Sequence, residues 1–397
     1  MKFLFLYSNL RIGGVQTLIL RMAKWLSQHG HSIHVFVADA HQDESFIASE
    51  LRRYASIDIV GVRGYQCLQI APFTHSFFRK QSYDVVHAFD PIGLWIAAQL
   101  SKSMRTRFVA GIYHPQYYQF KVTNLGGSYY PQGYEDLISA LPDNVFLFMN
   151  EATLNAHAHY YNRSFSASRI LPIPIENKLF GDNGPDNTFP QNESLRVVSV
   201  GRFVDFKRYP IGVMDAISAL RKNGHNVVFE LYGKGPLESE FKKYAQRRGF
   251  DFVRFMGVVP YQKFAQTVRG ALAFAGMGTA VLEAAAAGVP SLVMPVYSDG
   301  DKTLGYLHEQ KGFNLGEEGK PRSTFGELER LCHLSFGERL SLGERERRSA
   351  LKFSVDEVMP MYLSYVEDAC VLPADFELPS IFRVFYDKIL LYVKVKF

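Results

Sequence analysis

Residues 275–290 read AGMGTAVLEAAAAGVP and follow directly on the apolar run ALAFA at 271–275. The apolar run predicts a strand buried on both faces. Gly276 and Gly278 predict a turn in which a ligand can approach the backbone closely. Thr279 predicts the N-cap of a helix, and the final Gly-Val-Pro predicts its end. The stretch is therefore a strand, a glycine turn and a helix.

The start of this helix indicates an anion site. Backbone N–H groups near Thr279 to Val281 point out of the helix end, where the helix dipole favours negative charge by about 0.3–1 kcal/mol. Glu283 lies one turn further on and could hold ribose hydroxyls. The pattern is equally typical of an ordinary βα turn whose glycines only tighten the chain, so alone it leaves both interpretations open.

The rest of the chain repeats this alternation of strand and helix. Strand-like runs flank a glycine loop and a helical stripe near the N-terminus, and they recur after a polar linker. We expect an α/β fold, with two tandem Rossmann-like, doubly wound parallel-sheet domains that face a central cleft. The predicted parts are an N-terminal acceptor domain at 1–176, a linker at 177–194, a C-terminal donor domain at 195–353, and a returning helix with a basic tail at 354–397.

Composition excludes several classes of protein. Of the 397 residues, 47% are hydrophobic and 21% charged, which is typical of a soluble globular protein with two cores. The net charge of +5 suits anionic ligands but is too small for a nucleic-acid binder. The three cysteines are far apart, which predicts a cytoplasmic protein without disulfides or a cysteine zinc site. No apolar run reaches about 18 residues, which predicts that no segment spans a membrane.

Cations follow the first strand of the predicted C-terminal domain. Gly201 comes after the run RVVSV, and Arg202, Lys207 and Arg208 come shortly after Gly201. Arg202 offers a fork for two phosphate oxygens and Lys207 a movable point charge, although each alone could be a solvated surface residue. Together with the helix start after Gly278, the cluster favours phosphate binding at the carboxyl ends of the strands.

Other strand ends carry weaker signals. Gly233 begins a second glycine turn, which is compatible with close approach of a sugar or a base. Gly13 and Gly14 lack the third glycine of the dinucleotide fingerprint, so NAD binding is disfavoured. His87 stands at a strand end, and we interpret it as a structural histidine in preference to a ligand in the cleft.

Taken in order, these motifs resemble those of family 4 retaining glycosyltransferases of the GT-B fold. The resemblance extends from Met1 to about Val366 and is strongest from Val197 to Pro290. It implies transfer of a sugar from a nucleotide diphosphate-sugar, based on UDP or GDP, to a saccharide or lipid-linked acceptor with retained anomeric configuration. It also implies a reaction without a metal ion or other cofactor, and no Asp-x-Asp stands at an evident strand end.

The resemblance implies roles for individual residues. Arg202 and Lys207 match the pair that neutralises the donor diphosphate, and His114 matches the histidine beside the reacting carbon. Glu283 matches the glutamate that holds the donor ribose. The other implied donor-binding residues are Gly13, Gly14, Gly201, Gly233, Met256, Val258, Gly276, Met277, Gly278, Thr279, Ala280 and Val281.

One position departs from the family pattern, which has a second glutamate eight residues before Glu283. Here that position is Ala275, so a carboxylate expected to hold the transferred sugar is missing. Its loss would cost about 1.5–3 kcal/mol. Asp299 or Glu309 could supply a substitute. The alternative is a catalytically weakened homologue that serves as a nucleotide-sugar-binding or partner subunit of a glycosylation complex.

The C-terminal tail at 381–397 mixes large apolar residues with Arg383, Lys388, Lys394 and Lys396. A basic amphipathic segment of this kind can lie in a membrane interface, which would make the protein peripheral on the inner face of a membrane. It could equally pack across the N-terminal domain, with its lysine stems covering apolar surface. Together with the usual role of the family that the sequence resembles, the tail favours a role in surface polysaccharide or glycolipid synthesis.

Overall fold

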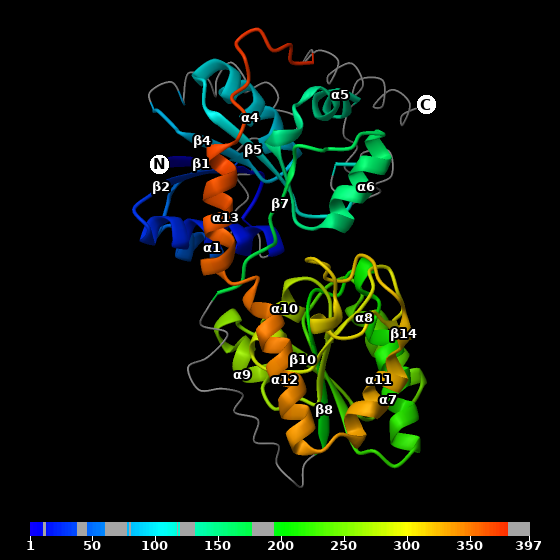
Figure 1. The fold of residues 1–397 in the computed structure, drawn as a ribbon. Coiled ribbons are helices and arrows are strands. Elements are labelled where there is room, and N and C mark those ends of the chain that lie inside the picture. Colours follow the sequence, from blue (N-terminus) through cyan, green and yellow to red (C-terminus); the bar gives the residue numbers. More distant parts are fainter. Residues whose placement is uncertain are drawn as a thin grey trace. The chain divides into compact units, whose positions relative to one another are not determined.

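The computed structural model describes residues 1–10, 13–37, 46–59, 78, 81–116, 118–119, 132–176 and 194–379. These residues belong to two units, Met1–Pro174 with Val358–Phe397, and Ile175–Glu357 (Figure 1). The predicted linker at 177–194, apart from Ser194, and the predicted basic tail at 381–397 lie outside the described residues.

The first unit contains a seven-stranded parallel sheet in the order β3-β2-β1-β4-β5-β6-β7. Its strands are β1 (Lys2–Tyr7), β2 (Ser32–Val37), β3 (Ser56–Ile59), β4 (Val85–Ala88), β5 (Arg107–Ile112), β6 (Phe146–Phe148) and β7 (Arg169–Ile170). The inner strands are mostly apolar and buried, as expected where helices cover both faces. The chain leaves β1 for β2 and returns to β4 on the other side, which makes a switch point between β1 and β4.

Amphipathic helices cover this first sheet. In α1, residues Leu18, Met22 and Leu26 are fully or almost fully buried and recur at the four-residue spacing that places them on one helix face. Among the described residues, the helices of the first unit are α1 (Gly14–Gln28), α2 (Phe46–Leu51), α4 (Pro91–Met104), α5 (Gln132–Ala140) and α6 (Glu151–Tyr161). A further helix, α13 (Val355–Glu367), begins in the second unit and ends in the first.

The second unit contains a five-stranded parallel sheet in the order β10-β9-β8-β11-β12. Its strands are β8 (Leu195–Val200), β9 (Val227–Tyr232), β10 (Val253–Gly257), β11 (Ala273–Gly276) and β12 (Ser291–Val293). The chain moves from β8 outward to β9 and β10, and then crosses back to β11 on the other side of β8. The switch point of this unit therefore lies between β8 and β11, which is the position where open α/β sheets bind ligands.

Helices form a layer on each face of the second sheet (Figure 1). One layer contains α7 (Pro210–Lys222), α8 (Glu238–Arg247) and α11 (Thr324–His333), and the other contains α9 (Phe264–Val268), α10 (Thr279–Ala286) and α12 (Phe336–Leu351). Neighbouring residues of a strand alternate between the two cores: Val197 packs with the first layer and Val198 with the second. The predicted fold of two Rossmann-like, doubly wound parallel-sheet domains is confirmed.

Candidate functional site

The carboxyl edge of the second sheet gathers the predicted donor-binding residues of that unit. Gly201 follows β8, Gly233 follows β9, and the turn at Met277 and Gly278 follows β11. Because β9, β8 and β11 are adjacent parallel strands, these turns lie side by side at one edge of the sheet, around the switch point. We call this set of strand ends the donor edge.

Lys207 is held at the donor edge by a short helical turn, Asp205–Lys207. Its ammonium lies above the backbone of Gly201, because a Cβ built on that glycine would be 3.6 Å from Lys207 Nζ. The side chain is partly buried, and within the described residues no carboxylate pairs with it. Burial, and next the nearby Arg202 guanidinium, lowers the pKa of Lys207 to about 8. A desolvated cation without a counter-ion suits the binding of an anion.

The two arginines of the predicted cation cluster differ in their partners. Arg208 contacts Glu240, and its Nε donates to Asp299 Oδ1 at 3.0 Å, so this residue is committed to ion pairs within the unit. Arg202 is exposed and has no ion-pair partner in the part of the chain that the structure describes. Arg202 and Lys207 are therefore the cations of the cluster that remain available to a ligand.

The start of α10 differs in detail from the prediction. The N-cap is Gly278, not Thr279, and Gly278 has φ 66° and ψ −150°, a conformation that only glycine adopts readily. Val281 N donates to Gly278 O, so, contrary to the prediction, the amide of Val281 is not open to a ligand. No acceptor for the N–H groups of Thr279 and Ala280 occurs among the described residues. Two amides at the helix start thus remain for an anion.

Glycines let the turns of the donor edge pack backbone against backbone. Gly233 has φ 147°, and a Cβ there would lie 1.9 Å from Gly201 O. Gly201 N in turn donates to Tyr232 O at 3.0 Å, and Phe203 N donates to Lys234 O at 3.0 Å. These contacts fix the chain on both sides of Arg202, so the turn that carries it is positioned by backbone bonds.

The end of β10 exposes apolar side chains. Met256 and Val258 flank Gly257 and are 47% and 63% exposed, although large hydrophobic residues elsewhere in this unit are mostly buried. Gly257 O accepts from Gly233 N at 2.7 Å, which joins this strand end to the donor edge. An exposed apolar pair beside backbone groups is the kind of surface on which a nucleobase can lie.

The two positions of the family glutamate pair differ sharply here. Glu283 lies in α10 and is 5% exposed. Ala275 is fully buried in β11, where its methyl group packs in the core with Met277 and other residues. Both predicted substitutes already have partners. Asp299 pairs with Arg208, and Glu309 Oε2 accepts from Tyr306 N and from Arg322.

In the first unit, His114 follows β5 at the carboxyl edge of its own sheet. Its Nδ1 accepts from Gln116 N at 3.2 Å, which assigns the proton of a neutral ring to Nε2. Burial lowers the pKa of His114, so the neutral form is favoured at physiological pH. The ring is therefore a hydrogen-bond donor through Nε2.

Gly13 and Gly14 stand at the same edge of the first sheet, where α1 begins. Gly13 is the N-cap, and of the residues that the structure describes none caps this helix with a side chain or places an acid in its first turn. Gln16 is buried and donates to Asn9 Oδ1 at 2.9 Å, which ties the first turn of α1 to a residue shortly after β1. The helix start thus presents backbone amides, as a glycine loop next to a phosphate requires.

Sequence reasoning missed Asp90, which organises this edge of the first unit. Asp90 Oδ2 accepts from Ser8 N at 2.6 Å and Oδ1 accepts from Gly93 N at 2.7 Å, so it joins the end of β1 to the start of α4. Burial raises the pKa of Asp90. An Asp-Pro pair at the end of a strand could have indicated it, since Pro91 occupies the first helical position.

His87 is a structural histidine, as predicted. It is fully buried, and burial lowers the pKa of His87 to about 3, so the ring is neutral. Its Nδ1 lies 3.0 Å from Tyr362 Oη and its Nε2 lies 2.9 Å from Tyr113 Oη. Both ring nitrogens are satisfied, and Tyr113 directly precedes His114.

Comparison with known proteins agrees with this architecture. Residues 12–174 match the family described as Glycosyltransferase Family 4, and residues 194–324 match the family described as Glycosyl transferases group 1. The chain therefore belongs to the glycosyltransferases of the GT-B fold that combine these two domains, and it is a transferase of sugars. Among curated proteins, none matches the sequence.

Several solved structures share the fold at low sequence identity. HepE from Anabaena, in complex with UDP-glucose, has a TM-score of 0.69 and 15% identity, covering 93% of this chain and 100% of that chain. A glycosyltransferase from Rickettsia africae has a TM-score of 0.68 and 13% identity, covering 92% and 98%. The lipopolysaccharide outer core galactosyltransferase WaaB has a TM-score of 0.62 and 14% identity, covering 93% and 99%. Across the described residues, no helix has the length and apolar character needed to cross a bilayer.

Proposed function

We propose that the protein transfers a sugar from a nucleotide diphosphate-sugar to a saccharide or glycolipid acceptor, with retention and without a metal ion. The observation that carries the proposal is the uncompensated charge at the donor edge. Lys207 is desolvated and has no carboxylate partner among the described residues, and two amides at the start of α10 lack acceptors there. Such a set of donors is stabilised by a bound diphosphate.

The chemistry follows from where charge develops. When the bond from the sugar to phosphate breaks, the leaving diphosphate gains negative charge and the sugar becomes oxocarbenium-like. Arg202, Lys207 and the amides of Thr279 and Ala280 are the groups that would stabilise the leaving diphosphate, an effect that can be worth several kcal/mol. This is the role of the divalent cation in metal-dependent transferases. In this proposal, His114 donates through Nε2 to the sugar beside the reacting carbon.

The remaining predicted residues complete the donor site. Glu283 would hold the ribose hydroxyls, and the exposed pair Met256 and Val258 would contact the base. HepE binds UDP-glucose, which supports a UDP-sugar donor. WaaB is a galactosyltransferase of the lipopolysaccharide outer core, which supports an acceptor in surface polysaccharide or glycolipid synthesis.

A second candidate function rests on Ala275. This residue removes one carboxylate of the family pair, and both predicted substitutes, Asp299 and Glu309, are engaged in ion pairs. A homologue that binds a nucleotide-sugar but turns it over slowly, as a partner subunit of a glycosylation complex, would tolerate this loss. The enzyme is favoured because the chain has all four of the other implied site residues, Arg202, Lys207, Glu283 and His114, and a scaffold does not need all four.

One screen separates these functions. The full chain is incubated with UDP-, GDP- and ADP-sugars in EDTA, and release of the nucleoside diphosphate is measured beside nucleotide binding. Turnover that EDTA does not change supports the metal-independent enzyme, and the anomeric configuration of the product then tests retention. Binding without turnover for every donor supports the partner subunit. The absence of both contradicts the donor site itself.

A further inference from the structure

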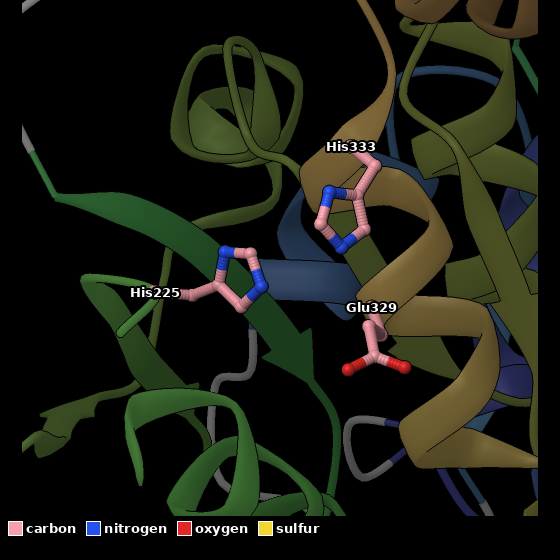
Figure 2. A group of neighbouring side chains, drawn as sticks. All are labelled: His225, Glu329 and His333. Atoms are coloured by element: carbon pink, nitrogen blue, oxygen red, sulfur yellow. The ribbon is translucent and has the colours of Figure 1, made fainter. Parts of the chain in front are cut away.

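A group of potential metal ligands lies in the second unit, outside the donor edge. His225 stands in the turn between α7 and β9, and Glu329 and His333 belong to α11. One ligand atom from each of the three residues lies within 4.8 Å of those of the other two. Figure 2 shows the rings of His225 and His333 beside each other, with the side chain of Glu329 next to them on α11. We propose that His225, Glu329 and His333 form a binding site for a transition-metal cation of the Zn²⁺ type, a site beyond the proposed transferase function.

The spacing on α11 explains two of the ligands. Glu329 and His333 are four residues apart in a helix that runs from Thr324 to His333, so their side chains project from the same face. A glutamate and a histidine at this spacing can reach one cation without any change of the backbone. This part of the site is therefore set by the sequence of one helix.

The third ligand is positioned by the end of α7. His225 N donates to Leu220 O at 3.1 Å and Gly224 N donates to Arg221 O at 3.1 Å, the pair of bonds of a Schellman motif. Gly224 has φ 89°, as this motif requires. The backbone of His225 is thus fixed, and its ring lies 5.1 Å from the ring of His333, centroid to centroid.

A further contact orients the carboxylate. Asn223 Nδ2 donates to Glu329 Oε1 at 3.1 Å. Metal-binding carboxylates are commonly held by an outer hydrogen bond of this kind, which limits the rotamers of the ligand. Asn223 is the C-cap residue of α7, so the turn that supplies His225 also supplies the group that holds Glu329.

The ligand set indicates the class of cation. Two imidazoles and one carboxylate suit Zn²⁺ and neighbouring transition metals, whereas Ca²⁺ and Mg²⁺ require oxygen ligands. Ligand atoms around tetrahedral zinc are about 3.4 Å apart. The present separations of up to 4.8 Å are longer, so side-chain rotations would bring the ligand atoms together; His225 and Glu329 are half-buried and His333 is exposed. A water molecule would complete the fourth position.

The site is separate from the donor edge. His225 precedes the first residue of β9 by two positions, whereas Gly233 follows the last residue of the same strand. A strand of six residues separates its ends by roughly 17 Å. A bound cation would therefore link the turn after α7 to α11 as a structural brace, and it would not contact the donor.

Zinc titration calorimetry of the full, untagged chain tests the proposal, with Mg²⁺ as the comparison cation. We expect a zinc-binding event that His225→Ala, His333→Ala and Glu329→Gln each weaken by about tenfold or more, and that Asn223→Ala weakens by about tenfold. His159→Ala, which removes an exposed histidine from α6, should retain the wild-type affinity. Zinc at about one hundred times its Kd should raise the melting temperature of the wild type by roughly 5 °C.

The metal-free melting temperature of each variant is measured first, so that a loss of binding cannot come from misfolding. Two results would overturn the proposal. One is a wild-type protein that binds no zinc in the micromolar range. The other is a set of ligand variants that bind zinc with the stoichiometry and affinity of the wild type, which would assign that zinc to other residues.

Discussion

Lys207 has two properties that rarely occur together on a surface lysine. Its ammonium lies over the backbone at the end of a central strand, and the pKa of Lys207 is lowered to about 8 by burial and by Arg202. The folded protein therefore binds this proton less tightly than the unfolded chain, whose lysine has an ordinary pKa of 10.5. As pH rises from about 8 to 10.5, this group increases the stability of the unliganded fold.

A bound diphosphate should reverse the shift in the pKa of Lys207, because an anion stabilises the ammonium. We predict that binding of a nucleoside diphosphate takes up protons near pH 8.5 and that affinity falls as pH rises above about 8. Calorimetry in two buffers of different ionisation enthalpy measures the uptake, and Lys207→Arg, which stays protonated, is the matched control. Binding with no proton exchange by the wild type would contradict the placement of Lys207 at the phosphates.

Gly278 tests the role of the backbone at the start of α10. Its φ of 66° and ψ of −150° are readily adopted by glycine only. A Cβ there would meet no atom within 4 Å, so a substitution would cause backbone strain without a steric clash. Gly278→Ala should therefore cost about 1–3 kcal/mol through backbone strain alone and should weaken nucleotide binding by moving the helix start. Urea unfolding and nucleotide calorimetry measure both effects.

Gly337→Ala is the control for this substitution, because Gly337 lies exposed in α12 and a Cβ there also has open space. It should leave nucleotide binding unchanged and stability unchanged or increased by less than about 1 kcal/mol. Equal behaviour of the two alanine variants would count against a special backbone conformation at Gly278.

At the scale of elements, Glu346 joins α12 to the chain around β12. Its carboxylate is fully buried and accepts the backbone N–H groups of Ser291, Leu307 and His308, at 3.3, 3.2 and 3.1 Å. The His308 ring contacts it as well. One side chain thus satisfies several buried donors, which secures the helix layer that contains α10.

Glu346→Ala should destabilise the second unit by about 3 kcal/mol or more, because each buried donor left unsatisfied costs about 1–3 kcal/mol. Glu344→Ala removes a partly exposed partner of Arg348 from the same helix and should cost less than about 1 kcal/mol. Thermal and urea unfolding compare the two variants. Similar losses would show that the buried network contributes little.

Individual elements show what local sequence can and cannot predict. The parallel strands follow from apolar runs between glycine turns, so β8 and β11 could be predicted from the residues they contain. The cap of α10 could not be predicted in this way, because Gly278 N donates to Leu315 O, a partner 37 positions along the chain. The separate roles of Arg202 and Arg208 depend likewise on Glu240 and Asp299, which only the fold brings to Arg208. Asp90 is different, since its Asp-Pro signal was present in the sequence.

At the scale of the whole molecule, the chain returns to its first unit after the second is complete. Tyr362 of α13 reaches His87, and Phe108 N donates to Cys370 O at 2.8 Å. Leu372 is fully buried in the first core, and Lys102 Nζ donates to Phe376 O at 2.7 Å. The segment up to 379 is therefore part of the fold of the first unit. The motif order predicted two α/β domains, but these side-chain contacts depend on tertiary packing.

The predicted membrane tail at 381–397 lies outside the described residues, and truncation tests it. Removal of 380–397 should lower binding to anionic liposomes while the melting temperature stays the same. Removal from Val371 onward should in addition lower the melting temperature, because Leu372 and Phe376 are lost from the first core. Neutral liposomes are the control. If the variant without residues 380–397 bound anionic liposomes as well as the full chain does, a role of the tail at membranes would be contradicted.

The most direct test of the account is the rate at which Lys207→Ala turns over a nucleotide-sugar in EDTA. Lys222→Ala, which removes an exposed lysine at the far end of α7, is the matched control. If Lys207 takes up the charge of the departing diphosphate, its removal should lower turnover by about tenfold or more, equivalent to at least about 1.4 kcal/mol. The control should keep the wild-type rate. A Lys207→Ala variant that also keeps the wild-type rate would contradict the central claim.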